Sequence, residues 1–302
     1  AKIHHVNVMG AFTLESSNWT NDQQVATNFP DDLTGANDMG RALDKATLSG
    51  DKGQQRLASF LGRVNYTLAD KYILTASFRS DGSSKFTDEN KWATFLSGAL
   101  AWRASEEKFI KDLNIFSNLK FRISYGETGN QGIGSYRINS QLDTANFPFG
   151  GSLSSGAADV AWRGPVDPNI KWETTKQWNA GIDFGWFKNR LTLTVDFYWK
   201  KTRDLLQEVI IAPSNGFSNM LTNTGNVTNK GLEITIGATP VDTKDWKWNL
   251  NGNIAFNKNS IGGLEGDQFA RTLWYGADNI FIQRNGCPIG AIYGYVEDGF
   301  YD

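Results

Sequence analysis

The stretch 172–202, WETTKQWNAGIDFGWFKNRLTLTVDFYWKKT, constrains the fold more than any other part of the chain. Apolar and polar residues alternate along two arms, 178–186 and 191–199, which a short segment at 187–190 connects. Such a period of two is typical of a β-strand with one apolar face and one polar face. The sequence therefore predicts an antiparallel hairpin.

The apolar stripe of each arm is uncharged over nine residues and ends in tryptophan. A strand tilted across a bilayer needs about 9–11 residues, whereas strands of soluble proteins most often have about 5–6. Aromatic rings gather where hydrocarbon meets headgroups. A hairpin of a soluble sandwich is the alternative. We predict that these side chains face the membrane: Trp178, Ile182, Phe184, Trp186, Leu193, Val195, Phe197 and Trp199.

The composition excludes several classes of function. A net charge of −2 argues against a nucleic-acid partner and against a polybasic membrane-surface role. No run approaches ~18 apolar residues, so the sequence predicts no transmembrane helix. The single cysteine, Cys287, cannot form an internal disulfide.

The same alternation recurs along the chain and predicts about nine strands. The expected strands are 2–14, 57–68, 72–79, 92–102, 119–125, 178–186, 191–199, 232–238 and 246–256. A helical turn or two is expected within 105–112, where early acids follow a serine.

The connections differ in length according to their order. We expect long loops at 15–56, 81–91, 127–171, 203–226 and 257–302, and shorter ones at 69–71, 105–117, 187–190 and 240–245. Long loops on one rim and short turns on the other are typical of an outer-membrane barrel with periplasmic turns. The predicted fold class is therefore all-β, an antiparallel transmembrane β-barrel. The insertion 127–171 is long enough to suggest a functional or mobile loop.

The polar sides of the strands carry many charges. A soluble core cannot bury so many charges without partners, whereas an aqueous or plugged lumen can accommodate them. We predict that Arg63, Arg79, Arg122, Asp183, Asp196 and Glu233 face the lumen, most of them as wall residues in salt bridges.

Several long blocks also resemble a known family. They are GRVNYTLADKYILTASFRSDGSSKF (62–86), KWATFLSGALAWRASEEKF (91–109), SYGETGNQGIGSY (124–136), the hairpin region 171–206, NTGNVTNKGLEI (223–234) and GCPIGAIYGYVEDGFYD (286–302). This succession resembles the barrel of the SusC/RagA-type TonB-dependent transporters of Bacteroidetes outer membranes. Residues 1–56 match more weakly.

The resemblance implies an outer-membrane importer of large nutrients, oligosaccharides or peptides. In that family the barrel is plugged, a SusD-type surface lipoprotein covers it, and TonB supplies energy. A plugged transporter has about 22 strands, so nine strands cannot close such a barrel. We therefore expect residues 1–302 to be an internal barrel segment without a plug domain, a TonB box or the closing strands. A passive porin and a soluble extracellular glycan-binding β protein remain the alternatives.

Signals for chemistry are sparse. No phosphate loop, zinc-protease, CxxC or GxSxG motif occurs, so we expect neither an enzyme nor an organic cofactor. His4 and His5 point to opposite faces of a strand and do not make a metal pair. Asp31, Asp32 and Asp298 could bind Ca²⁺ but lack the ligand spacing of a calcium loop.

Aromatic residues in the predicted extracellular loops are the candidates for cargo contact, because a sugar face stacks on an aromatic ring. They are Phe147, Phe149, Trp162, Trp274 and Tyr275. Packing within the loops or against a lid protein is the alternative role. Lys176 and Lys201 lie at the outer end of the membrane-facing stripes, where they could meet lipid phosphates or extend to the interface.

Overall fold

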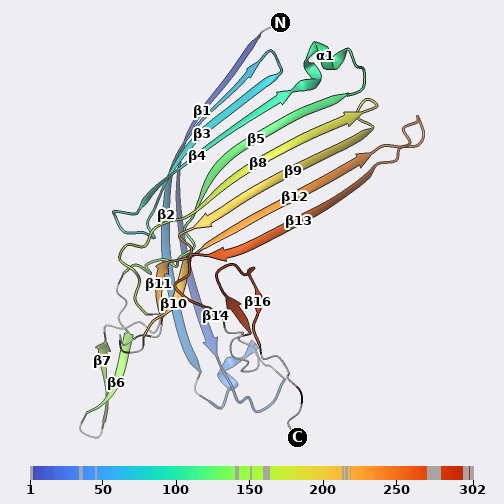
Figure 1. The fold of residues 1–302 in the computed structure, drawn as a ribbon. Helices are drawn as coiled ribbons and strands as arrows, with labels where there is room; N and C mark the ends of the chain where they lie inside the picture. Colours follow the sequence, from blue (N-terminus) through green and yellow to red (C-terminus); the bar gives the residue numbers. More distant parts are fainter. Residues whose placement is uncertain are drawn as a thin grey trace.

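A computed structural model describes residues 3–33, 37–44, 46–139, 143–149, 152–158, 164–212, 214, 217, 219–270, 280–294 and 299. Its main feature is one twisted sheet of nine long strands (Figure 1), in the order β1-β2-β3-β4-β5-β8-β9-β12-β13. Every neighbouring pair is antiparallel. The sheet is thus a meander in which each strand lies beside the next long strand of the chain.

The nine strands match the nine predicted ones in order, which confirms the all-β antiparallel fold class. Their bounds are β1 (His4–Val25), β2 (Thr47–Leu68), β3 (Tyr72–Ser83), β4 (Trp92–Arg103), β5 (Asn118–Asn130), β8 (Glu173–Trp186), β9 (Leu191–Arg203), β12 (Asn226–Ala238) and β13 (Leu250–Gly262). Two arms of 14 and 13 residues, β8 and β9, form the hairpin from which the prediction began.

The predicted loop 15–56 is wrong in extent. The ladder between β1 and β2 continues to the pair Val25–Thr47, so the connection comprises only 26–46. Both strands are polar on both faces in this part, and their side chains are largely exposed. Alternation of polarity disappears where both faces meet water, although the backbone hydrogen bonds continue. The sequence pattern therefore ended before the strands did.

The other long loops also contain regular structure. The segment 127–171 includes the end of β5 and the hairpin of β6 (Asp143–Phe149) and β7 (Ser152–Ala158). The segment 203–226 includes β10 (Leu206–Ile210) and β11 (Asn219–Asn223). The segment 257–302 includes the end of β13 and the short strands β14 (Gln268–Ala270), β15 (Phe281–Gln283) and β16 (Ala291–Ile292). The last long strand begins at Leu250, so Trp246 and Trp248 precede it.

The two ends of the sheet differ as the loop lengths predicted. One end carries the short connections, including the 3₁₀ turn η3 (Ala104–Glu106) and helix α1 (Lys108–Lys111). Figure 1 shows this end at the top, with β6, β7, β10, β11, β14 and β16 at or beyond the opposite end. We call these the turn end and the loop end. No helix in the described part of the chain is long and apolar enough to span a membrane.

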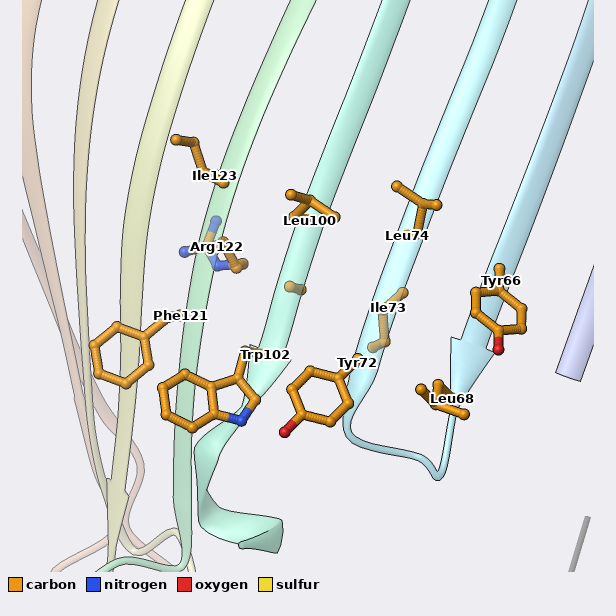
Figure 2. Close-up of a pocket in the computed structure, with 11 residues that line it drawn as sticks. Tyr66, Leu68, Tyr72, Ile73, Leu74, Leu100, Trp102, Phe121, Arg122 and Ile123 are labelled. Atoms are coloured by element: carbon orange, nitrogen blue, oxygen red, sulfur yellow. The ribbon is translucent and has the colours of Figure 1, made fainter. Parts of the chain in front are cut away.

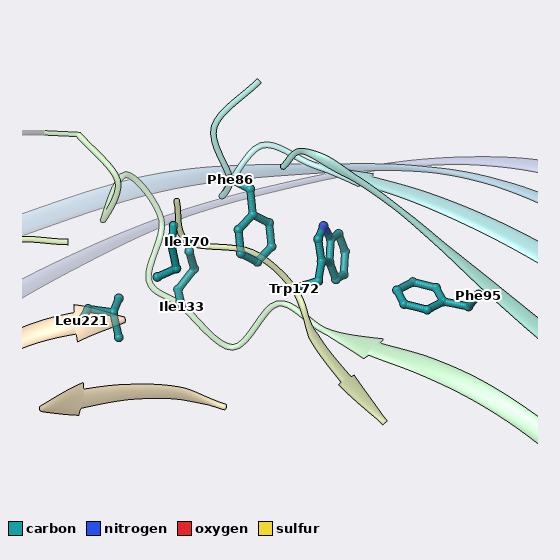
Figure 3. Packing of buried hydrophobic residues seen from close by; sticks show 6 residues of the cluster. All are labelled: Phe86, Phe95, Ile133, Ile170, Trp172 and Leu221. Carbon is teal, nitrogen blue, oxygen red and sulfur yellow. The ribbon is translucent and has the colours of Figure 1, made fainter. Parts of the chain in front are cut away.

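The largest buried apolar cluster lies at the loop end, where connections pack against one residue of the long sheet, Phe95 on β4. It consists of Phe86, Phe95, Ile133, Ile170, Trp172 and Leu221 (Figure 3). The connections after β3 and β5, together with β11, contribute to this cluster, which we call the loop core. Most of the sheet, by contrast, leaves its large apolar side chains exposed.

Candidate functional site

The strand register divides the sheet into a polar face and an apolar face. Residues that pair across antiparallel strands point to the same side. Facing positions on β2, β3, β4 and β5 place Arg63, Arg79 and Arg122 on the same side of the sheet. The positions that face Arg122 in turn on β8, β9 and β12 lie on this side as well. All six residues predicted to face a lumen therefore share the polar face: Arg63, Arg79, Arg122, Asp183, Asp196 and Glu233.

An ion network lies near the centre of the polar face. The Arg122 guanidinium on β5 donates hydrogen bonds of 2.9 Å to both carboxylate oxygens of Asp183 on β8. Its Nη2 also lies 2.9 Å from Asp196 Oδ1 on β9. Lys120 Nζ is 3.8 Å from Asp183, and Thr194 donates to the same carboxylate. One arginine thus bridges acids on two further strands, and a planar guanidinium suits this bidentate geometry.

Gly181 makes room for this network. A Cβ atom at Gly181 would lie 2.7 Å from Arg122 Nη2, and it would also collide with the Asp196 carboxylate. A larger residue would force the guanidinium or the Asp196 carboxylate to shift. The glycine between Ala180 and Ile182 therefore leaves the space that the ion network occupies.

Polar side chains beside the network surround a hollow of about 570 Å³. Gln177, Asn179, Lys200, Asn229 and Glu233 line this hollow, together with Arg122 and Asp196. The hollow therefore offers both hydrogen-bond donors and acceptors to an aqueous phase or to a polar solute.

A second ion pair lies on the polar face, closer to the loop end. Arg79 Nε donates to both oxygens of Asp81 at 2.8 Å, and its Nη2 donates to Ser59 at 3.2 Å. Asp81 is only 8% exposed and Ser59 only 3%. Arg79 and Asp81 line a groove of about 480 Å³, together with Arg63 and with Phe95 and Trp172 of the loop core.

The loop core covers this part of the polar face. Phe95, paired with Arg79, is the large residue among small ones on the polar side of β4. Its ring meets Trp172 edge-on at 6.0 Å, and Trp172 stacks on Phe86 at 5.1 Å. The Trp172 indole also donates to the carbonyl of Lys91 at 3.2 Å. The long connections are thus anchored over the polar side of the sheet.

The apolar face carries all eight residues predicted to face the membrane. Paired positions such as Ile182–Val195 and Trp178–Trp199 place the stripes of β8 and β9 side by side. The apolar surface extends onto β12 and β13 through Leu232, Ile234 and their partners on β13. Trp178 is 47% exposed and Phe197 50%. A surface so apolar and so exposed needs a non-aqueous environment.

Aromatic rings border the apolar face at the turn end. Trp102 stacks on Phe121 at 5.6 Å, and both line an apolar groove of about 460 Å³ with Tyr66 and Tyr72 (Figure 2). Glu107 fixes the polar edges of these rings, since it accepts hydrogen bonds from Tyr72 at 2.7 Å and from Trp102 at 3.4 Å. Lys71 pairs with the same carboxylate at 2.8 Å. This cluster lowers the pKa of Glu107, mainly through the Lys71 hydrogen bond and then through Tyr72.

The predicted cargo-contacting aromatics stay predictions. Trp162, Trp274 and Tyr275 lie outside the described residues, and Phe147 and Phe149 lie in β6, of which only the backbone is described. Asp298 also lies outside the described residues. Asp31 pairs with Arg41 at 2.8 Å. Within the described part of the chain, no three His, Cys, Asp or Glu side chains come together to hold a metal.

Sequence reasoning missed the loop core and the Glu107 cluster. The sequence contained one signal for the loop core, because Phe95 interrupts a row of small residues. Nothing in the sequence pairs Phe95 with Trp172, 77 positions further on. Glu107 lies in a connection for which only a helical turn was expected. Its partners are Lys71 in another connection, Tyr72 on β3 and Trp102 on β4, so only the fold brings them together.

A twisted meander with an exposed apolar belt, an ion-paired polar face and long connections at one end defines a segment of an outer-membrane β-barrel. Residues 4–283 match the family described as TonB dependent receptor-like, beta-barrel. The chain therefore belongs to this family of outer-membrane proteins.

The relatives give the same family. The TonB-dependent receptor SusC of Bacteroides thetaiotaomicron is 39% identical over 253 residues, which cover 81% of this chain and 25% of SusC. The TonB-dependent receptor P39 of Formosa agariphila is 33% identical over 298 residues, covering 99% of this chain and 28% of P39. The chain thus spans about a quarter of the length of these relatives.

Solved structures agree with the sequence relatives. The structure of the RagAB peptide transporter matches with a TM-score of 0.76 and 25% identity, over 95% of this chain and 31% of that chain. The "closed-closed" and "open-open" states of the RagAB peptide importer both match with a TM-score of 0.75. The match to a SusC/RagA-type barrel segment confirms the family that the sequence blocks indicated.

Proposed function

We propose that this chain forms part of the barrel wall of an active importer of large nutrients, oligosaccharides or peptides. The observation that carries the proposal is the membership of the TonB-dependent receptor family, with SusC as a relative and the RagAB peptide transporter as a structural match. The chain spans about a quarter of SusC, so the activity of the whole protein is inferred from these relatives.

The polar face would form the inner wall of the conduit. The network of Arg122 and Lys120 with Asp183 and Asp196 supports this role, because two cations paired with two carboxylates keep an aqueous wall ordered without an excess charge of one sign. The polar hollow beside the network offers mixed donors and acceptors. Such a wall suits uncharged or zwitterionic polar cargo better than strongly charged cargo.

The loop end would face the cell exterior, since the short turns of outer-membrane barrels are periplasmic. A SusD-like surface lipoprotein would cover this end, and the loop core would hold the connections in place beneath it. Energy would come from the TonB complex. The aromatics Phe147, Phe149, Trp162, Trp274 and Tyr275 remain the proposed cargo contacts. We propose no catalytic step for this chain.

Energy dependence tests the proposal directly. Cells that carry the protein are given fluorescent oligopeptides or oligosaccharides, with and without a functional TonB complex. The importer predicts that uptake of one cargo class is lost when TonB is inactive. Uptake that persists without TonB would favour the passive porin and overturn active import.

Purification gives a second test. The protein is extracted from outer membranes in detergent and its bound proteins are identified. The proposal predicts a stoichiometric surface lipoprotein. A chain that stays in solution without detergent would instead support a soluble glycan-binding β protein.

A further inference from the structure

Two pairs of lysines face each other across strands on the apolar side of the sheet. Lys176 on β8 is directly opposite Lys201 on β9, and Lys230 on β12 is directly opposite Lys258 on β13. Side chains so paired have Cβ atoms about 4.5–5.5 Å apart, and like charges in these positions destabilise a sheet. Each pair therefore needs counter-charge from elsewhere.

The surrounding side chains supply little of it. Glu127 on β5 lies 2.9 Å from Lys176 Nζ and also accepts a hydrogen bond from Tyr125. On β8, β9, β12 and β13, from the row of Trp178 to the loop end, every charged side chain on this face is a cation. These cations are Lys176, Lys201, Arg203, Lys230 and Lys258, which we call the cation ladder.

Among the described residues, only Lys176 of the ladder has an ion-pair partner within 4.0 Å. Neighbouring strands lie about 4.8 Å apart, so four adjacent strands bring the five cations onto one compact patch. The excess positive charge of this patch is complementary to a polyanionic surface.

The ladder lies at a defined depth. Trp178 and Trp199 pair across β8 and β9 and end the apolar belt, which begins at Trp186. From Trp186 to Trp178 the belt comprises nine residues of β8, which agrees with the about 9–11 residues that a tilted strand needs to cross a bilayer. The ladder lies level with the Trp178 row or one to two rows beyond it. This is the depth of lipid headgroups on the loop side.

We propose that the cation ladder binds the phosphate groups of outer-leaflet lipids. The ammonium and guanidinium groups would donate charge-assisted hydrogen bonds to phosphate oxygens. The lysine stems would lie along the apolar belt while their charged ends reach the headgroups. The acyl chains of the lipids would contact Phe197 and the other apolar side chains between the cation ladder and the turn end. The bound phosphates would relieve the repulsion between the facing lysines. This role is independent of cargo and of energy supply.

The chain contains a matched control. Lys200 is the neighbour of Lys201 in β9 but lies on the polar face, where it lines the polar hollow. The double variant Lys176→Gln/Lys201→Gln removes charge from the ladder, whereas Lys200→Gln removes the same charge from the opposite side. Lys176→Arg/Lys201→Arg keeps the ladder's charge.

The experiment measures binding of phosphorylated lipid A to the intact detergent-solubilised protein by native mass spectrometry, alongside the same lipid after removal of phosphate. Lysines near an anionic surface contribute about 1 kcal/mol each, so the Lys176→Gln/Lys201→Gln variant should bind about thirtyfold more weakly, equivalent to about 2 kcal/mol. Lys200→Gln and the arginine variant should bind like wild type. The dephosphorylated lipid should bind weakly to all of them.

Three outcomes would overturn the proposal: equal binding of dephosphorylated lipid, unchanged binding by the Gln double variant, or an equal loss in Lys200→Gln. Competition by millimolar inorganic phosphate with no preference for lipid would indicate a free-phosphate site instead. If the double variant does not fold, the salt dependence of lipid binding by the wild-type protein still tests the proposal. Its lipid binding must weaken with salt, because exposed charges are screened, and salt-independent binding would reject the ladder.

Discussion

The guanidinium of Arg122 on β5 and the carboxylate of Asp183 on β8 share two hydrogen bonds of 2.9 Å, although 61 positions separate them in the chain. The two residues are one row apart on paired strands. Removing the arginine leaves Asp183 and Asp196 close together without their shared cation.

We expect Arg122→Leu to lower the free energy of unfolding by about 1.5–3 kcal/mol, the range for hydrogen bonds to charged groups. The double variant Arg122→Leu/Asp183→Asn should recover part of this loss, because it removes the unpaired charge as well. Thermal unfolding in detergent measures both. A double variant with the summed loss of the two single variants would show that the pair is not coupled.

Gly181→Ala tests the space beneath the network. An added Cβ would crowd Arg122 and Asp196, and overpacking costs about 1–3 kcal/mol. Gly10→Ala is the matched control in β1, where a Cβ atom would meet nothing within 4 Å. We expect a lower melting temperature for Gly181→Ala alone. Equal melting temperatures for the two variants would argue against the close approach.

Trp172→Ala tests the loop core. Trp172 is 7% exposed and contacts Phe86 and Phe95, and such truncations cost about 3–5 kcal/mol. We expect faster proteolysis within the connections 84–91 and 131–139, with the sheet intact. The control variant Trp246→Ala, at a residue that is 71% exposed, should be cleaved by the protease at the wild-type rate. Unchanged proteolysis in Trp172→Ala would mean that the loop core does not hold these connections.

Glu107 makes the turn end sensitive to acid. Its pKa lies below the ordinary value of 4.5, mainly because of Lys71. A lowered carboxyl pKa stabilises the fold above the ordinary value, and this contribution is lost as the pH falls through the folded-state pKa. The melting temperatures of wild type and Glu107→Gln should therefore differ at neutral pH and converge as the pH falls below 4.5 and through the folded-state pKa. A difference between the two melting temperatures that stays the same from pH 7 to pH 3 would contradict this assignment.

The parts of the strands that lie inside the apolar belt were predictable from the sequence, and the parts that extend beyond it were not. In β8 and β9 one face meets hydrocarbon, so a period of two appears from Trp178 to Trp199. The outer halves of β1 and β2 are polar on both sides, so the pattern gave a loop where the ladder continues to Val25 and Thr47.

The candidate site was predictable by face but not by contact. Alternation assigns Arg122, Asp183 and Asp196 to one side of the sheet, and in the strand register the three residues share one face. Their hydrogen bonds depend on which strands become neighbours, and alternation carries no such information. The same holds for Trp172 and Phe95, whose contact depends on how a long connection folds back.

We infer that the apolar face of the sheet contacts lipid and that the polar face contacts water. Two neighbouring residues of β9 test this arrangement. The single substitutions Phe197→Cys and Tyr198→Cys each carry a spin label in a Cys287→Ser background, with the protein in lipid bilayers. We expect the label at 197 to collide mainly with dissolved oxygen and the label at 198 to collide mainly with a water-soluble nickel complex. Equal nickel accessibility at both positions would contradict it.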